Sequence, residues 1–182
     1  MGVQKFYHPV LKNPVLNNFK TSSNVIILNG ANMSGKSTFL RSVSLCFYLA
    51  NIGIAIPAEK SEIPFISNFS IKITKNDDLT KGYSHFMSEI INLKEVVEKA
   101  INGEKCFAVF DELFSSTNVE DAFKICKTTI KGLSRFDNSF FFISTHNQSL
   151  EGIKKSNIDS YYLDTELKDE NPNFNYKIKK GW

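Results

Sequence analysis

Two kinds of hydrophobic pattern alternate along the chain. Short runs of consecutive apolar residues occur at residues 24–28 (NVIIL), 106–110 (CFAVF) and 140–144 (FFFIS). Between these runs, apolar residues recur every three or four positions. A short continuous run is typical of a strand buried on both faces, whereas the wider spacing is typical of a helix with one buried face. The pattern therefore predicts strands that alternate with helices.

Three helices are predicted from the spacing and from the residues that end them. The first spans residues 37–50 and stops before Gly53. The second begins near Ser84 and closes at Gly103, with an apolar face formed by Phe86, Ile90, Leu93, Val97 and Ile101. The third spans residues 119–133, with a shared face formed by Ala122, Ile125, Thr129 and Leu133. Strands and helices in this order predict a mainly parallel sheet flanked by helices, whose ligands bind beyond the carboxyl ends of the strands.

Composition narrows the class of protein. The 182 residues suit one domain, and the 42% hydrophobic and 13% aromatic content exclude a disordered chain. The net charge of +3 is weak, and Arg41 and Arg135 are the only arginines. Because arginine supplies most bidentate readout of bases, this chain by itself is poorly equipped to read DNA sequence.

Cysteine usage and hydropathy indicate a cellular location. Cys46, Cys106 and Cys126 lie far apart in apolar contexts without a CxxC pair, so we expect buried free thiols rather than metal ligands or disulfides. No apolar run approaches the ~20 residues of a membrane span, and residues 1–10 lack the apolar centre of a signal peptide. These features predict a cytoplasmic protein with no membrane partner.

The first candidate site follows the first predicted strand. Within NGANMSGKST (residues 29–38), Gly30, Gly35, Lys36 and Ser37 match the phosphate-loop pattern GxxxxGK[ST]. Glycines let backbone N–H groups surround the phosphates, the lysine neutralises β- and γ-phosphate oxygens, and the hydroxyl ligates Mg²⁺. A glycine-rich turn without a ligand is the alternative, but the strand before the loop and the helix after it favour nucleotide binding.

The other two candidate sites follow the next two apolar strands. Asp111 and Glu112 end the run CFAVF, where an acid reaches the Mg²⁺ shell and the following glutamate is placed as general base for an attacking water. A pair of helix-capping acids is the alternative. His146 follows FFFIS, where it can touch the γ-phosphate or orient the water, although a lone histidine is more often structural. We interpret His8 and His85 as surface or packing residues.

Several ordered motifs resemble those of the MutS family of DNA mismatch repair proteins. The loop GANMSGKST is similar to the GPNMxGKST of the family's ATPase domain, where Asn-Met between the two glycines distinguishes the family. NIGIAIPAEKSEI resembles IGxxVPAxxxxI, and DDLTKGYSHFMSEI resembles DDLxxGxSTFxxEM. DELFSSTNVEDA, STHN and FNYKIKKG resemble DExGRGTSxxDG, ATHY and the strand YKVKxG. The resemblance covers essentially the whole chain.

The resemblance implies a P-loop NTPase fold of the ABC-ATPase type, with a small antiparallel N-terminal portion beside the parallel sheet. It implies ATP and Mg²⁺ as ligands and a head-to-tail homodimer with two composite ATP sites. Taken alone, Ser84 would be read as a helix N-cap. In the family, the equivalent serine reaches the partner's γ-phosphate in trans, which fits the absence of an arginine placed to act as a trans finger.

The resemblance also implies a role for each candidate residue. Asp111 supports Mg²⁺ with Ser37, Glu112 is the general base, and His146 senses the γ-phosphate. The loop that holds the nucleotide consists of Gly30, Ala31, Asn32, Met33, Ser34, Gly35, Lys36, Ser37 and Thr38, of which Asn32 helps to position the water or the phosphates.

The chain departs from the family pattern at defined positions. The family's arginine before the signature serine is Tyr83, and its threonine after it is His85. After the acidic pair, GRGTS is replaced by residues 114–118 (FSSTN). Residues 15–18 (VLNN) match the family's VPND loop beside the base only loosely. These departures leave open a nucleotide-gated switch with little hydrolysis.

Family members carry clamp, lever and connector regions before the ATPase domain and dimerisation helices after it. Residues 1–182 hold only the ATPase domain, so we expect a domain of a longer chain, or a reduced protein, that hydrolyses ATP slowly in isolation. DNA contacts would come from regions of the full-length protein outside this chain, and downstream repair proteins are further partners. A paralogue that acts in recombination, or another ABC-type ATPase of DNA maintenance, is the alternative.

Overall fold

The computed structural model describes residues 1–73, 85–115, 118–146, 150–151, 153, 156–168 and 171–182. Its helices are α1 (Lys36–Asn51), α2 (His85–Ile101) and α3 (Val119–Leu133). Its strands are β1 (Gly2–Phe6), β2 (Asn17–Lys20), β3 (Val25–Asn29), β4 (Lys60–Glu62), β5 (Asn68–Lys72), β6 (Cys106–Phe110), β7 (Phe140–Thr145), β8 (Ile158–Lys168) and β9 (Asn171–Lys180).

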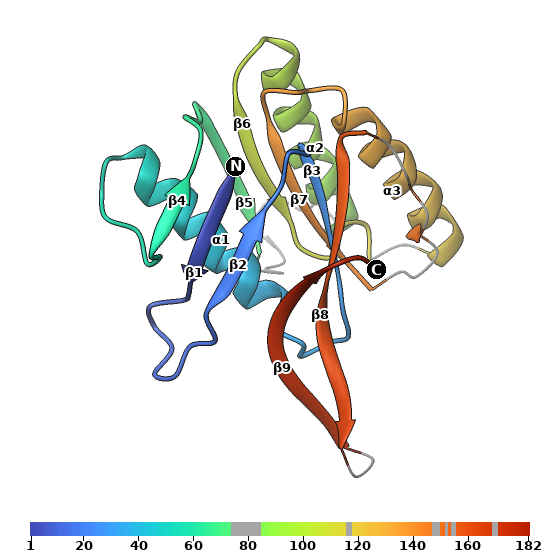
Figure 1. Cartoon of the computed structure of the whole chain (residues 1–182). Helices are drawn as coiled ribbons and strands as arrows, with labels where there is room; N and C mark the ends of the chain where they lie inside the picture. Colours follow the sequence, from blue (N-terminus) through green and yellow to red (C-terminus); the bar gives the residue numbers. More distant parts are fainter. Residues whose placement is uncertain (74–84, 116–117, 147–149, 152, 154–155, 169–170) are drawn as a thin grey trace.

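The described strands form two sheets (Figure 1). The larger sheet has the order β5-β6-β7-β3-β8-β9, and its strands are parallel except for β9, which pairs antiparallel with β8. The smaller sheet is antiparallel, with the order β2-β1-β4. The predicted mainly parallel sheet and the small antiparallel N-terminal portion are therefore confirmed, and the fold is mixed α/β.

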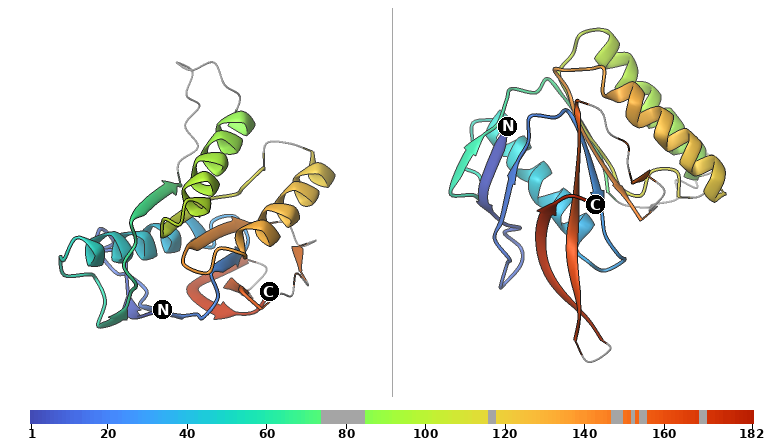
Figure 2. Two further views of the ribbon diagram at one scale, coloured as in Figure 1. Left: turned by 90° about the horizontal axis from the view of Figure 1, so that it is seen from above. Right: turned by 45° about the vertical axis from the view of Figure 1, so that its right-hand side comes forward.

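Each face of the six-stranded sheet carries its own hydrophobic core. Helix α1 and the three-stranded sheet cover one face, whereas α2 and α3 lie side by side on the other (Figure 2). Along β3, Ile26 and Leu28 join the first core, while Val25 and Ile27 join the second. A strand buried on both faces needs apolar residues at every position, which explains the uninterrupted runs in the sequence.

Aromatic packing fixes the small sheet over the start of α1. Phe6 of β1 and Phe19 of β2 both pack edge-to-face against Phe39, with ring centroids 5.5 and 6.1 Å apart. Phe19 also packs on Phe142 of β7 at 5.5 Å. Each such pair contributes about 0.5–1.5 kcal/mol beyond its buried area. The chain between β1 and β2 is consequently held beside the first turn of α1, where the candidate site lies.

The predicted elements agree closely with the observed ones. Helix α3 has the predicted bounds, and β3, β7 and α1 differ from theirs by a residue or so at their ends. The apolar face predicted for α2 is largely confirmed, since Phe86, Ile90, Leu93 and Val97 pack against the second core. At the end of that face, Ile101 is 67% exposed, which corrects its predicted place in the core. Ser84, predicted to open this helix, lies outside the described residues.

The three cysteines are buried free thiols, as predicted. Burial raises the pKa of Cys46 and of Cys126 to about 12, so both stay protonated and unreactive at neutral pH. None of the helices in the described part of the chain is long and apolar enough to cross a membrane.

Candidate functional site

The carboxyl ends of the central parallel strands bring the candidate polar residues together. The Ser37 hydroxyl donates to Asp111 Oδ2 at 2.6 Å, although the two residues are far apart in sequence. Ser144, near the end of β7, donates to the other oxygen of Asp111 and accepts from the backbone N–H of Glu112 at 2.8 Å. The glycine loop after β3 and the acidic pair after β6 thus form one site at the carboxyl ends of the parallel strands, across the intervening strand β7.

Backbone geometry explains both glycines of the loop between β3 and α1. Gly30 has φ 154°, and a Cβ there would lie 2.7 Å from Ser34 Oγ. Gly35 has φ 101°, and a Cβ there would lie 3.0 Å from Cδ1 of the Tyr176 ring. A side chain at either position would need both a strained backbone and displaced neighbours. The loop wraps this tightly only because these two residues are glycines.

Lys36 is 5% exposed and turns its amino group into the loop. Its Nζ donates to the carbonyl oxygens of Gly30 at 2.7 Å and Ala31 at 3.0 Å. Burial lowers the pKa of Lys36, while the negative charges of Glu112 and Asp111 oppose this shift. An anion entering the loop would offer the ammonium group charged acceptors in place of neutral carbonyls, which adds attraction between opposite charges. The lysine is therefore placed to exchange its partners for a phosphate.

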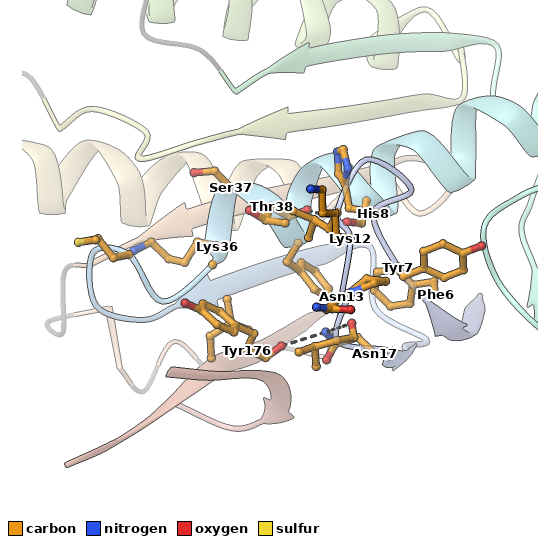
Figure 3. A pocket seen from close by; sticks show the side chains of 18 of the residues that line it. Phe6, Tyr7, His8, Lys12, Asn13, Asn17, Lys36, Ser37, Thr38 and Tyr176 are labelled. Carbon is orange, nitrogen blue, oxygen red and sulfur yellow. Dashed lines mark hydrogen bonds between the residues drawn. The ribbon is translucent and has the colours of Figure 1, made fainter. Parts of the chain in front are cut away.

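A cavity of about 580 Å³ opens beside the loop. One wall is the loop with the first turn of α1, and the opposite wall is the chain between β1 and β2 (Figure 3). Tyr176 of β9 lines it as well. Small-molecule sites typically measure roughly 300–1,000 Å³, so the cavity suits a nucleotide-sized ligand. Its far wall contains Phe6, Tyr7, His8, Leu11, Lys12, Asn13, Pro14, Val15 and Asn17.

Most of this far wall was not predicted from the sequence. His8, interpreted as a surface or packing residue, is one of the side chains that line the cavity. Tyr176 was predicted only as part of a strand near residue 182. Both reach the site because the small sheet and β9 fold against the start of α1, and contacts between such distant segments leave no mark on local periodicity. Residues 15–18 are the part of the sequence that could have indicated this wall, because they resemble the family's loop beside the base of the nucleotide.

His146 and Glu112 share a second, smaller cavity of about 360 Å³. Apolar side chains form its floor, among them Leu113, Phe114 and Cys126. His146 is exposed at the end of β7 and does not line the larger cavity, whereas Glu112 lines both. Glu112 thus marks the place where the two cavities meet.

The segment after Glu112 has an unusual backbone. Glu112 and Phe114 have φ angles of 55° and 61°, in the left-handed region that favours glycine. Phe114 stands where the resemblance places a family glycine, and its side chain is fully buried beside the ring of Phe86. Its N–H donates to Glu89 Oε2 of α2 at 3.2 Å. Core packing and this bond hold a conformation that glycine would adopt without strain.

Some candidate residues lie outside the described part of the chain. These are Ser84 with the preceding residues 77–83, residues 116–117 after the acidic pair, and residue 147 of the STHN motif. His85, the first residue of α2, is interpreted correctly as a packing residue, since its side chain is 25% exposed with Nδ1 3.7 Å from Glu89 Oε1.

The chain matches known proteins over nearly its whole length. The family model described as MutS domain V matches residues 26–182. The DNA mismatch repair protein MutS of Persephonella marina is 31% identical over 188 residues, which cover 99% of this chain and 21% of that protein. MutS protein homolog 4 of Homo sapiens is 29% identical over 196 residues, covering 100% of this chain and 21% of that protein. The chain thus spans about a fifth of the length of these relatives.

Proposed function

This chain belongs to the MutS family, and we propose that it binds and hydrolyses ATP with Mg²⁺ at the glycine loop. The observation that carries the proposal is the bond between Ser37 and Asp111 beside the buried Lys36. A hydroxyl and a carboxylate are the hard oxygen donors that Mg²⁺ prefers. Together with a strand, a glycine loop and a helix in sequence, this arrangement supports a P-loop NTPase of the ABC type.

Each candidate residue has a separate role in the proposed reaction. Residues 30–38 would surround the phosphates with backbone N–H groups, and Lys36 would move from its own loop carbonyls to phosphate oxygens. Ser37 and Asp111 would hold Mg²⁺, which neutralises charge on the transferred phosphoryl group. Glu112 would accept the proton of the attacking water as the bond to the leaving ADP oxygen breaks. His146 would contact the γ-phosphate from the second cavity.

The far wall of the cavity suits the base of the nucleotide. Tyr176 offers an aromatic ring at the mouth of the loop, and Leu11 and Val15 offer apolar surface. Aromatic stacking on a nucleobase contributes about 1–3 kcal/mol. The cavity would therefore bind ATP with its phosphates at Lys36 and its adenine toward the chain between β1 and β2.

The assembly that we propose is a head-to-tail homodimer. Each loop would be completed by Ser84 of the partner, which supplies an N–H and a hydroxyl near the γ-phosphate. In the full-length protein, nucleotide state would be coupled to DNA binding by regions outside this chain, in mismatch repair. A MutS-like role in recombination is the alternative.

Substitution of Lys36 tests the proposal directly. Lys36→Ala should weaken ATP binding at least tenfold, because a charged contact to phosphate is lost. Titration calorimetry with MgATP measures the affinity, and phosphate release measures the turnover. Arg41→Ala, in the exposed part of the same helix, is the matched control and should bind ATP like the unchanged protein. Equal ATP affinity in all three proteins would contradict the proposed site.

A nucleotide-gated switch with little hydrolysis is the second candidate function. The buried Phe114 in place of a glycine favours it, because the segment after Glu112 is anchored in the core rather than free to rearrange. Glu112→Gln separates the two functions. If Glu112 is a general base, turnover should fall by roughly a hundredfold or more while ATP still binds. If the chain is a switch, the rate is near zero before and after the change.

A further inference from the structure

Strand β9 carries a bulge beside the glycine loop. Its pairing register with β8 shifts between Leu163 and Thr165, which leaves extra residues of β9 opposite Asp164. Tyr176 lies in this bulge with φ 55°, a left-handed backbone that costs a non-glycine residue about 1–2 kcal/mol. Bulges commonly re-aim a side chain next to a functional site. Here the bulge directs the Tyr176 ring onto Gly35.

The side chain of Asn17 makes two hydrogen bonds to the backbone of this bulge. Its Nδ2 donates to the carbonyl oxygen of Tyr176 at 3.0 Å, as Figure 3 shows, and its Oδ1 accepts from the N–H of Ile178 at 2.9 Å. One residue of a neighbouring parallel strand would make this same pair of bonds, through its own N–H and its own carbonyl oxygen. The carboxamide of Asn17 therefore acts as one residue of an added strand, on the edge of β9 that faces away from β8.

Other contacts in this region do not replace these two hydrogen bonds of Asn17. Lys177 Nζ donates to the carbonyl oxygen of Leu16 at 2.6 Å, which ties the two segments together without bonding Tyr176. The Asn175 side chain accepts from the N–H of Lys177 at 3.1 Å, within the bulge itself. The donor from Asn17 to the Tyr176 carbonyl and its acceptor for Ile178 thus fix the backbone on both sides of the ring.

We propose that Asn17 is a positioning residue, whose carboxamide holds the bulge of β9 and so keeps the Tyr176 ring against Gly35, where the base of a bound nucleotide stacks. The inference rests on the proposed ATP site and concerns its specificity for a base. Without the two hydrogen bonds of Asn17, the strained backbone at Tyr176 relaxes and the ring leaves this position. Contacts to the phosphates do not involve Asn17 and remain.

The expected result is a loss that depends on the base. Asn17→Ala should weaken MgATP binding about tenfold, the scale of one stacking contact, and leave the affinity for inorganic tripolyphosphate unchanged. Titration calorimetry measures both ligands. Asn18→Ala is the matched control, because Asn18 lies on the same strand and its Oδ1 accepts from the N–H of Lys5 at 2.8 Å, on β1. This control should bind both ligands like the unchanged protein.

A double-mutant cycle shows whether Asn17 acts through the ring. Tyr176→Ala should weaken ATP binding by a similar factor, and adding Asn17→Ala to it should cause little further loss. Independent, multiplying losses would overturn the inference, as would an equal weakening of ATP and tripolyphosphate binding by Asn17→Ala. If Asn17→Ala does not fold, Asn17→Asp keeps the acceptor for Ile178 but loses the donor to Tyr176. It should show the same selective loss.

The failure of this inference differs from the failure of the proposed function. A protein that binds neither ATP nor tripolyphosphate, with or without Lys36→Ala, overturns the proposed ATP site and the inference with it. A protein that binds both ligands, and keeps its full ATP affinity in Asn17→Ala, overturns the role of Asn17 alone.

Discussion

Gly35 combines a backbone requirement with a packing requirement. Its φ of 101° starts α1 at Lys36, so the loop can turn back on itself and present its N–H groups. The missing side chain also admits the ring of Tyr176. At the residue scale, the missing side chain of Gly35 thus shapes both the glycine-loop end of the cavity and the contact with Tyr176.

Gly35→Ala should therefore cost more stability than an equivalent change elsewhere. The matched control is Gly53→Ala, where φ is 75° but no atom lies within 4 Å of the added Cβ. We expect a loss of about 1 kcal/mol at Gly53 from the backbone alone, and roughly 2–3 kcal/mol at Gly35, where the ring must also move. Urea unfolding measures both values. Equal losses would mean that the Tyr176 ring adapts freely.

Asp159 of β8 contacts both β9 and the residue that follows β2. Asp159 of β8 accepts from the Thr21 hydroxyl at 2.6 Å, just after β2, and pairs with Lys180 of β9 at 2.8 Å. Burial alone would raise the pKa of Asp159, but the bonds from Lys180 and Thr21 outweigh it and lower the pKa below 3.8. At the element scale, this carboxylate joins the small sheet to the edge of the large one.

The lowered pKa of Asp159 predicts how stability changes with pH. Because the folded carboxyl binds a proton more weakly than the unfolded one, its stabilisation is present above pH 3.8 and is lost as pH falls through the folded pKa. Asp159→Asn should cost about 1–3 kcal/mol at pH 7. The gap to the unchanged protein should close in strong acid. Glu59→Gln, in an exposed pair with Lys5, is the control and should change little.

Urea unfolding from pH 7 down to pH 2 checks this prediction. A gap between Asp159→Asn and the unchanged protein that stays constant over this range would show that the carboxylate charge is not what stabilises the fold.

The sequence predicted the centre of the molecule better than its periphery. Strands β3, β6 and β7 were predicted because they are buried on both faces and their apolar runs are continuous. Strand β5, at the edge of the sheet, mixes polar and apolar residues and was not predicted. The bulge at Tyr176 and the cavity wall at His8 depend on contacts between distant segments. They could not be predicted from local patterns.

Among the candidate residues too, those at the central strands were predicted better than those that depend on the surrounding loops. Ser37, Asp111 and Glu112 were each predicted to lie beyond the carboxyl end of a central parallel strand, and the structure brings Ser37 within hydrogen-bond distance of Asp111. His146 lines the second cavity, which meets the larger one at Glu112, and its contact with the γ-phosphate stays a prediction. A strand's end can be predicted from its sequence, but the direction of the side chain that follows depends on the loops around it.

At the scale of the whole molecule, a composite ATP site can be tested by mixing two inactive proteins. Lys36→Ala removes the phosphate contact of a subunit's own loop, and Ser84→Ala removes what that subunit would offer to its partner. In a mixed dimer, the loop of the Ser84→Ala subunit faces the intact Ser84 of the other subunit. One complete site is thereby restored in each mixed dimer, while the second site carries both defects.

Each variant alone should hydrolyse ATP at a small fraction of the unchanged rate. An equal mixture that exchanges subunits freely should recover about a quarter of that rate, because half of the dimers are mixed and each has one of two sites intact. Phosphate release at high protein concentration measures the recovery. Lys36→Ala mixed with Lys36→Ala/Ser84→Ala is the control and should stay inactive, since no loop is intact. Two variants that remain inactive when mixed would contradict sites shared between subunits and would place each active site within one chain.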